Sequence, residues 1–327
     1  MTQARSFGSE SLDRQLWHAL RTRHAVPLKY VYLSEGANRH RKLVLSEEYG
    51  LAGTEAVFLD SRLSKIAQSL PMKGVNVLDV GCGVGLKAIS LAQYLFRQQG
   101  QLDYYLLDIS SRMIEIASTN IRGFLPEVNV YSATVDFETT PFLAIAEAAR
   151  DRSSHENLLL FLGNTLGNPF DRAATLLNLS LSMVESDFLL IGVELFRRHN
   201  VSSIVSHYAN ETFYDAVFYG LEHLGVKRSD GTFQVEYDYE ANDVLVWFLP
   251  SRQITIQLSE GTLEYSPGDR ILLMVSHKFT VRELQGLVKR AGLIEAQYWT
   301  DDLADYALML CRAHAHRDYG GKVERSS

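Results

Sequence analysis

Between residues 75 and 193, short apolar runs alternate with segments in which apolar residues recur every three or four positions. The runs are typical of strands buried on both faces, and the three-to-four spacing is typical of amphipathic helices. The pattern predicts strands at 75–80, 104–107, 128–132, 158–162 and 188–193, and helices at 86–96, 113–121 and 172–183. This alternation indicates an α/β fold built on a parallel sheet.

The pattern changes after residue 193 and later returns. A helical stretch at 194–223 precedes predicted strands at 233–239, 243–249, 253–258 and 270–276, with turn residues between them. A helix at 281–291 and strands at 294–299 and 306–312 then resume the first pattern. We therefore expect a discontinuous α+β domain inserted between the fifth and sixth strands. The predicted domains are 56–193 with 277–327, and 1–55 with 194–276; the helical segment 9–60 is expected to pack on the insertion.

Composition narrows the class of protein. The chain has 327 residues, 46% hydrophobic and 22% charged, with a net charge of −7, which is ordinary for a globular enzyme and does not favour a nucleic-acid partner. The densest basic cluster, Arg39 to Lys42, is interpreted as a solvated helix face. The two cysteines, Cys82 and Cys311, have no nearby partner, so we expect a reducing compartment and no metal site. The start of the chain does not resemble a signal peptide and no apolar run reaches membrane-spanning length. These features predict a cytoplasmic protein without a membrane partner, as a monomer or weak homo-oligomer.

The first strand ends in a glycine-rich turn that is the first candidate site. The segment Asp79-Val-Gly-Cys-Gly-Val-Gly85 places Gly81, Gly83 and Gly85 between a strand and a helix, where a ligand can contact the backbone. A dinucleotide fingerprint would require glycine at position 86, which is Leu86. The loop therefore favours S-adenosylmethionine (SAM) over a nucleotide, with a purely structural turn as the third interpretation.

Acids after the next two strands strengthen this interpretation. Asp108 ends the second strand, where a carboxylate can accept the hydrogens of both ribose hydroxyls; a helix-capping acid is the alternative. Asp136 and Phe137 follow the third strand, where an acid can bind the adenine amino group and an aromatic ring can stack on the base. The glycine loop, Asp108 and the Asp136-Phe137 pair thus stand at or just after the ends of three successive predicted strands of a strand–helix–strand framework.

The fourth strand leads into Phe161-Leu-Gly-Asn-Thr-Leu-Gly-Asn168. With the glycine loop and the insertion, this segment resembles the histidine-specific SAM-dependent methyltransferases, a family that includes ergothioneine-pathway amino-acid Nα-methyltransferases and dimethylallyltryptophan N-methyltransferases. The resemblance extends from about Tyr30 to Cys311. It implies a Rossmann-like methyltransferase domain with a discontinuous substrate domain, and SAM as the cofactor.

The resemblance also implies which residues form the sites. The cofactor set adds Tyr49 and Lys87 to the glycines, Asp108, Asp136 and Phe137, with Lys87 binding the carboxylate of SAM; an exposed helix lysine is the alternative for Lys87. Gly163 and Asn168 correspond to substrate-loop residues, and Asn168 grips the α-amino group and carboxylate. Tyr208 corresponds to a carboxylate-binding tyrosine, and Tyr32 to one that lines the side-chain pocket. The alternatives are a turn asparagine for Asn168 and core or interface tyrosines for the other two.

One departure from the family pattern concerns the substrate. Histidine-methylating members carry a glutamate two residues before a serine, and that acid pairs with the substrate imidazole. Here Met274 stands in the position of the acid while Ser276 is kept, and Val246 stands where a neighbouring pocket methionine is usual. An apolar wall leaves a buried imidazole N–H unpaired, at a cost of about 1–3 kcal/mol. An apolar or aromatic amino acid, preferably similar to tryptophan, is the better prediction.

The sequence thus predicts a SAM-dependent N-methyltransferase with Asn168 and Tyr208 as the catalytic candidates and a small amino-acid-like molecule as substrate. Three alternatives remain: a histidine Nα-methyltransferase, a SAM methyltransferase acting on another small biosynthetic metabolite, and a nucleotide-binding oxidoreductase or non-catalytic SAM-binding protein.

Overall fold

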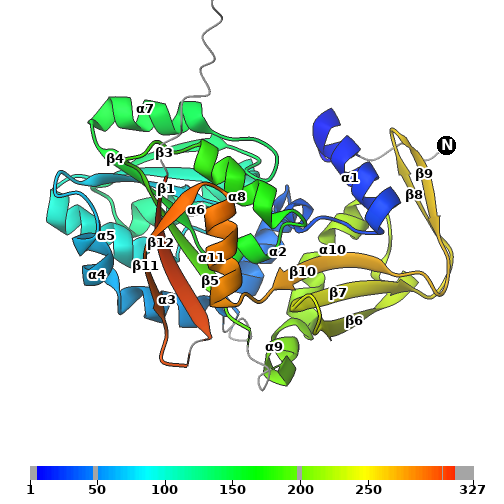
Figure 1. Cartoon of the computed structure of the whole chain (residues 1–327). Helices are drawn as coiled ribbons and strands as arrows, with labels where there is room; N and C mark the ends of the chain where they lie inside the picture. Colours follow the sequence, from blue (N-terminus) through cyan, green and yellow to red (C-terminus); the bar gives the residue numbers. More distant parts are fainter. Residues whose placement is uncertain (1–5, 47–50, 197–200, 304, 314–327) are drawn as a thin grey trace, which may run out of the picture.

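The computed structural model describes residues 6–46, 51–196, 201–303 and 305–313. Two units lie side by side in Figure 1, each built around its own antiparallel or mixed sheet. We call them the seven-stranded unit and the three-stranded unit, after the largest sheet in each.

The seven-stranded sheet has the order β11-β12-β5-β4-β1-β2-β3. Strands β1 to β5 run parallel, and β12 and β11 add an antiparallel edge next to β5. Every residue of β1 and of β5 is buried, as their continuous apolar runs predict. The strands are β1 (Val75–Val80), β2 (Asp103–Asp108), β3 (Asn129–Thr134), β4 (Glu156–Phe161), β5 (Phe188–Glu194), β11 (Leu293–Thr300) and β12 (Tyr306–Ala313).

Helices cover both faces of this sheet and form two apolar cores. Successive strand residues alternate between them, so that Val77 packs in one core and Leu78 in the other. One face carries α3 (Leu51–Asp60), α4 (Leu63–Gln68), α5 (Ile89–Gln99) and α6 (Ser111–Phe124). The other carries α7 (Leu143–Ser153), α8 (Arg172–Leu181) and α11 (Val281–Arg290). The carboxyl ends of the parallel strands are consequently free to form a ligand site.

The three-stranded unit is assembled from two distant parts of the chain. Its antiparallel sheet has the order β10-β7-β6, and a hairpin of β8 and β9 extends from it. The part inserted after β5 comprises α9 (Val201–Tyr208), α10 (Glu211–His223), the 3-10 turn η4 (Arg228–Asp230), β6 (Gly231–Asp238), β7 (Asp243–Pro250), β8 (Ile254–Leu258), β9 (Gly261–Tyr265) and β10 (Ile271–His277). The N-terminal part comprises α1 (Glu10–Arg23), the 3-10 turn η1 (Leu28–Tyr32) and α2 (Gly36–Val44).

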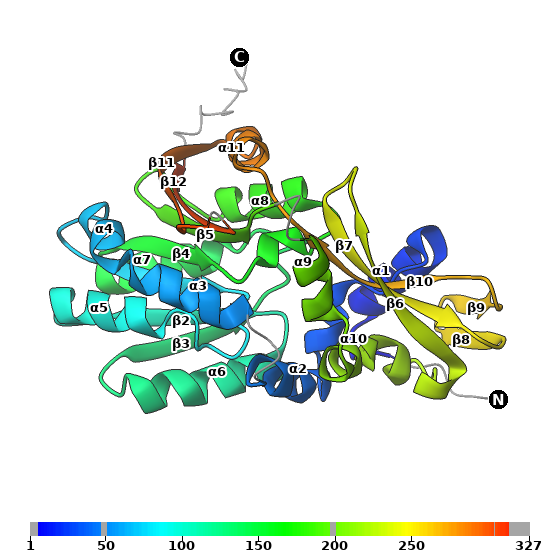
Figure 2. The same cartoon turned by 90° about the horizontal axis from the view of Figure 1, so that it is seen from below.

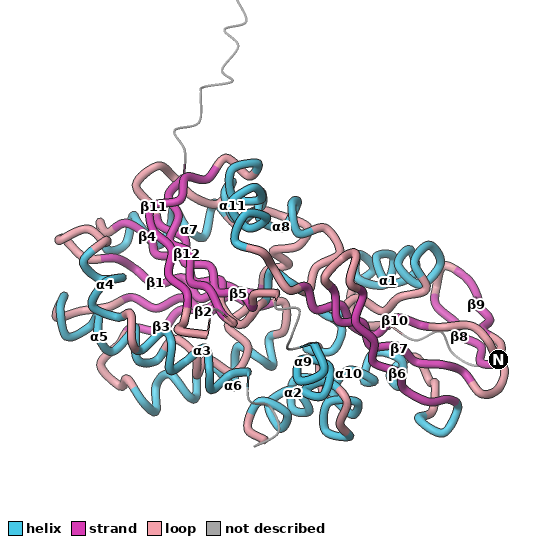
Figure 3. Tube along the Cα trace, turned by 60° about the horizontal axis from the view of Figure 1, so that its bottom comes forward, coloured by secondary structure: helices cyan, strands magenta, loops and turns pink. Residues whose placement is uncertain are grey.

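The two parts share one core. Leu16 and Leu20 of α1 and Tyr30 of η1 pack with Phe213 and Phe248 of the inserted part. Seen from below, α2 lies between α6 and α10 (Figure 2), and Arg112 of α6 bonds to Asn38 of α2. The tube in Figure 3 shows β10 leading directly into α11, so the chain passes from one unit to the other there.

The predicted fold class is confirmed, and the main differences from the predicted elements have local causes. Helix α7 was not predicted because its buried positions are the alanines Ala146 and Ala149, which give a faint apolar pattern. Strand β9 was missed because it is five residues long and opens with Gly261. The stretch 194–223 contains two helices, because the Asn210 side chain accepts the backbone N–H of Phe213 and starts α10 anew.

The expectation that all of 9–60 packs on the insertion is wrong for α3. Phe58 and Leu59 belong to a core of the seven-stranded unit. The predicted domain boundary at residue 56 therefore falls inside α3. Within the described residues, none of the helices combines the length and apolar character needed to cross a membrane.

Candidate functional site

The glycine loop joins β1 to α5 at the carboxyl edge of the large sheet. Gly81, Gly83 and Gly85 have φ angles of 68°, 53° and 73°, which other residues rarely adopt. A Cβ at Gly85 would lie 2.9 Å from the Cβ of Ala117 in α6, so this glycine also allows the loop to lie close against that helix. The loop therefore presents backbone, not side chains, to the space above the sheet.

That space is a cavity of about 910 Å³ including its open mouth, which we call the glycine-loop cavity. The structure brings the described members of the predicted cofactor set together in its wall: Gly81, Gly83, Gly85, Lys87, Asp108, Asp136 and Phe137. Tyr49, the remaining member, lies outside the described residues.

Asp108 is held at the end of β2 by backbone donors. Its two carboxylate oxygens accept the N–H of Gly83 at 3.1 Å and that of Ser110 at 3.0 Å. Burial raises the pKa of Asp108 to about 6, although these hydrogen bonds favour the charged form and act in the opposite direction. A second acceptor site on each oxygen remains for a ligand hydroxyl.

Asp136 has a partner that the sequence did not reveal. The ammonium of Lys29, a buried side chain on η1, lies 2.8 Å from Oδ2 of Asp136 and 3.7 Å from Glu138. The same ammonium donates to Gln15 of α1 at 2.6 Å. The three-stranded unit thus closes one wall of the glycine-loop cavity with a cation.

Lys87 lies over the loop that follows β4. Its ammonium is 3.8 Å from the carboxylate of Glu55, and a Cβ at Gly163 would clash with it at 1.7 Å. Glu55 is itself buried and accepts the Gly163 N–H at 2.6 Å and the hydroxyl of Tyr306. Gly163, with φ of 80°, is therefore required for Lys87 to reach this position.

A second cavity, of about 620 Å³ including its open mouth, lies between the two units, and we call it the inner cavity. Its wall contains most of the predicted substrate set: Tyr32, Gly163, Asn168, Tyr208, Met274 and Ser276. Val246 is not part of this wall; it is completely buried as the cross-strand partner of Met274. The Asn168 side chain has no hydrogen bond to the described residues, so its amide is available to a ligand.

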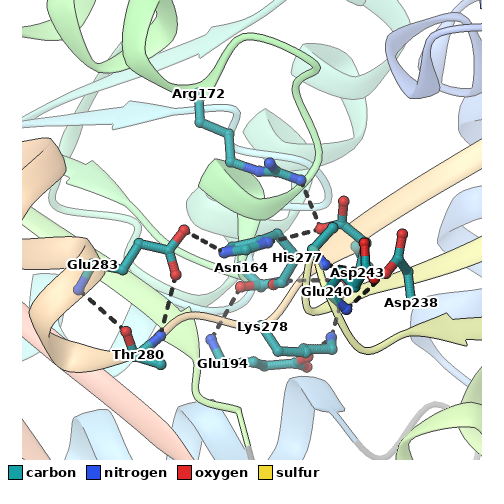
Figure 4. A network of polar contacts seen from close by, with 12 residues as sticks. Asn164, Arg172, Glu194, Asp238, Glu240, Asp243, His277, Lys278, Thr280 and Glu283 are labelled. Carbon is teal, nitrogen blue, oxygen red and sulfur yellow. Dashed lines mark hydrogen bonds and ion pairs between the residues drawn. The ribbon is translucent and has the colours of Figure 1, made fainter.

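Lys278 completes the polar side of the inner cavity from behind. Its ammonium pairs with Glu194 and donates to the hydroxyls of Tyr208 at 2.8 Å and Ser276 at 3.0 Å (Figure 4 shows Lys278 beside Glu194). Lys278 is fully buried, and burial lowers its pKa to about 7. Lys278 was not predicted as a site residue, although a lysine within an apolar run, between Ser276 and Phe279, could have indicated a buried charge.

The same end of β10 is tied to the large sheet. Asn164, in the left-handed region at φ of 55°, donates to Ser276 and to the carbonyl of His277, and accepts the N–H of Glu194. His277 lies between Asp243 at 2.7 Å and Glu283 at 2.9 Å, and Arg172 also contacts Asp243 (Figure 4). This network fixes Ser276 and Lys278 relative to β5.

The prediction that Arg39 to Lys42 form a solvated helix face is only partly correct. Arg41 and Lys42 are exposed, and Arg39 pairs with Asp215 and Glu222 of α10. His40 instead points inward, is half-buried, and lines both cavities.

Comparison with known families gives one match that spans nearly the whole chain. Residues 12–313 match the family described as "Histidine-specific methyltransferase, SAM-dependent". The match includes both units and both cavities.

Relatives with named activities have low sequence identity to this chain, but the similarity covers most of its length. A histidine N-alpha-methyltransferase of Mycobacterium tuberculosis is 25% identical, over 93% of this chain and 95% of its own length. The L-tryptophan methyltransferase trpM of Psilocybe serbica is 28% identical over 64% of this chain and 63% of its own. The N-methyltransferase dtpB of Aspergillus flavus is 22% identical over 92% of this chain and 88% of its own.

Proposed function

The chain belongs to the histidine-specific, SAM-dependent methyltransferase family, and from this premise we propose a more specific activity. We propose that it methylates the α-amino group of an amino acid, or of a metabolite derived from one, whose side chain is apolar or aromatic and not histidine. The observation that carries this proposal is the composition of the inner cavity wall, which has Met274 at the position expected for an imidazole-binding acid.

The residues of the glycine-loop cavity fit SAM. Asp108 would bind the ribose hydroxyls, Asp136 and Phe137 the adenine, and Lys87 the carboxylate, above a loop whose glycines leave room for the ligand. The Oδ1 atom of Asp136 remains for the adenine amino group, since Lys29 takes Oδ2. When bound, SAM supplies a methyl group on a positively charged sulfur, an electrophile that needs a neutral amine placed in line with it.

The polar part of the inner cavity suits the two charged groups that every α-amino acid carries. Tyr208 and Ser276 place two hydroxyls 3.0 Å apart in the wall, and Lys278 donates to both from behind it, which suits a carboxylate. Asn168, whose amide is unbonded among the described residues, would orient the amine. These residues come from α9, β10 and the loop after β4.

The other part of the wall is apolar and comes mostly from η1, α2 and α10. Its members are Val31, Leu43, Phe213, Ala216, Val217 and Met274. An imidazole buried against them would lose a hydrogen bond at a cost of about 1–3 kcal/mol, which corresponds to roughly 5- to 150-fold in discrimination. A flat apolar ring would be stabilised there, and methionine adapts to such shapes.

The first experiment is to incubate the protein with SAM and each of the twenty amino acids and to record mass shifts. We then compare kcat/KM for tryptophan and histidine in the wild type and in Met274→Glu. The variant is expected to gain activity on histidine, because a carboxylate can pair with the imidazole, and to lose activity on tryptophan. Met274→Gln, polar but uncharged, is the control that separates charge from polarity.

A wild type that prefers histidine would overturn the proposed specificity and favour a histidine Nα-methyltransferase. Methylation of none of the twenty amino acids would instead favour a modified metabolite as substrate. Both outcomes leave the SAM-dependent chemistry of the family intact.

A further inference from the structure

Lys278 is a buried lysine that uses its full capacity to donate hydrogen bonds. Its ammonium contacts the carboxylate of Glu194, the hydroxyl of Tyr208 at 2.8 Å and the hydroxyl of Ser276 at 3.0 Å. An ammonium has three hydrogens and no lone pair, so these three contacts occupy all of its hydrogens. Tyr208, Ser276 and Glu194 lie in the wall of the inner cavity, whereas Lys278 lies behind that wall.

Asn164 supplies a second fixed donor to Ser276. Its Oδ1 accepts the backbone N–H of Glu194 at 3.0 Å, so the other end of the amide is the NH2 group. That group donates to the Ser276 hydroxyl and to the carbonyl of His277, each at 3.2 Å. The Ser276 oxygen therefore receives one hydrogen from Asn164 and one from Lys278, and neither nitrogen can accept a hydrogen in return.

The number of lone pairs decides the direction in which the two hydroxyls donate. Ser276 has two lone pairs, and the donors on Lys278 and Asn164 occupy both, so Ser276 acts toward any further partner as a donor. Tyr208 lies 3.0 Å from Ser276 but cannot donate to an oxygen whose lone pairs are occupied, and Lys278 accepts nothing. The Tyr208 hydrogen is therefore directed away from both Ser276 and Lys278.

Glu194 gives Lys278 a second effect on the inner cavity. Its carboxylate reaches the wall, where an uncompensated negative charge would repel a bound carboxylate. The contact with Lys278 compensates this charge, and the two side chains are only 0% and 11% exposed. Donation from an ammonium in such surroundings also polarises the hydroxyls that receive it and strengthens the hydrogen bonds that they donate. Lys278 therefore favours an anionic ligand without lining the cavity itself.

We propose that Lys278 is the positioning residue that makes a free carboxylate a requirement for the substrate, an inference that rests on the proposed amino-acid substrate. Lys278 orients the hydroxyls of Tyr208 and Ser276 as donors and compensates the charge of Glu194 beside them. The protein then discriminates against the amide, the ester and the decarboxylated amine of its substrate. All three compounds keep the chemistry of an amine but lack the negative charge.

The test compares kcat/KM for tryptophan and for tryptophan amide, in which a neutral group replaces the carboxylate. We expect the wild type to favour tryptophan by at least about tenfold, the effect of one hydrogen bond to a charged group. In Lys278→Met the preference should fall to about threefold or less, mainly through a raised KM for tryptophan, with KM for SAM unchanged. Comparing proteins cancels the difference in amine basicity between the two substrates. The assays are run near pH 6.5, because burial lowers the pKa of Lys278 to about 7 and its ammonium must be present.

Two further variants separate this role from a general loss of structure. Lys278→Met leaves Glu194 uncompensated, so Lys278→Met combined with Glu194→Gln, which removes both charges, is tested beside it. The double variant is expected to keep the reduced preference, because its hydroxyls are no longer oriented. Lys29→Met is the matched control: Lys29 is also buried and paired, but its partner Asp136 belongs to the glycine-loop cavity. It should raise KM for SAM and keep the wild-type preference for the carboxylate.

Wild-type turnover on the free amino acids is measured first. If the wild type prefers histidine, the same comparison is made with histidine and its amide, so the result does not depend on the side chain. Equal activity of the wild type on acid and amide, or the full preference in the double variant, would overturn the inference and leave the proposed function intact. Methylation of none of the twenty amino acids would remove the inference together with the amino-acid substrate on which it rests.

Discussion

The two cavities differ in how the chain builds them. The glycine-loop cavity is formed mainly at the ends of β1, β2 and β3, by backbone turns and residues within a few positions of them. The inner cavity draws on η1, α2, the loop after β4, β5, α9, α10, β10 and β12. Under the proposed assignment, local backbone geometry would hold the cofactor, whereas side chains from many parts of the molecule would contact the substrate.

The difference extends to charge. In the glycine-loop cavity, Asp108 is stabilised by backbone N–H groups, and the side chain of Lys87 remains partly exposed. Behind the inner cavity, Lys278 and Glu194 form a buried ion pair held by neighbouring hydroxyls. We therefore expect the substrate side to be far more sensitive to the loss of one charge.

The largest effect should follow Lys278→Met. Removing one partner of a buried pair leaves Glu194 uncompensated, which typically costs about 3–5 kcal/mol of folding free energy. Lys87→Met, on the cofactor side, removes a partly exposed ammonium 3.8 Å from Glu55, which keeps its hydrogen bonds from Gly163 and Tyr306, so the loss should be smaller. Denaturant unfolding of both variants measures the contrast, and equal losses would show that the two sides are not built differently.

A smaller effect is expected for Asp108→Ala, measured as SAM affinity by calorimetry. Hydrogen bonds to a charged acceptor are worth about 1.5–3 kcal/mol each, so the dissociation constant should rise at least tenfold. In the wild type, SAM binding should weaken as pH falls through about 6, because burial raises the pKa of Asp108 to that value and the carboxylate is then protonated.

NADH provides the control for this cofactor prediction. Binding of NADH more tightly than SAM would mean that the glycine loop holds a dinucleotide. If the SAM affinity of the wild type does not change as pH falls through about 6, the ribose contact belongs to another residue.

The smallest effect concerns the network that joins the units. Burial lowers the pKa of His277, but its hydrogen bonds to Asp243 and Glu283 outweigh burial and the net pKa is raised. A raised pKa means that this stabilisation is complete below the unfolded value near 6.5 and is lost as pH rises through the folded value. His277→Gln should remove that dependence.

Unfolding free energies of the wild type and His277→Gln, measured from pH 6 upward, check this expectation. Burial lowers the pKa of Lys278 to about 7, which gives both proteins an opposite slope in the same range, so the difference between them is the informative quantity. A constant difference across the range would contradict a charged His277.

The same contrast explains which features the sequence could reveal. Gly81, Gly85, Asp108 and Phe137 were predicted because each is tied to a strand end, and strand ends follow from local apolar runs. The pairing of Lys29 with Asp136 joins residues 107 positions apart, and no local pattern encodes it.

Predictions for single residues were wrong where contacts made only in the folded protein decide whether a side chain lines a cavity. His40 lies between basic residues that face solvent, and only the packing of α2 against the other elements turns it inward. Val246 and Met274 were both predicted to line the substrate pocket; Met274 lies in the wall of the inner cavity, whereas Val246, its partner across the two strands, is covered by the core. Both outcomes depend on how the elements pack in the assembled unit.

The pairing of the N-terminal segment with β10 has a consequence for synthesis of the chain. Leu272 exchanges backbone hydrogen bonds of 2.8 Å with residues 24 and 26, and Ala25 forms a bridge with it. At about 5–20 residues per second, the ribosome needs roughly ten to fifty seconds to make the intervening stretch. During that interval the N-terminal segment lacks its β10 partner, so the first part of the protein to be made can complete its packing only after Leu272 has been added.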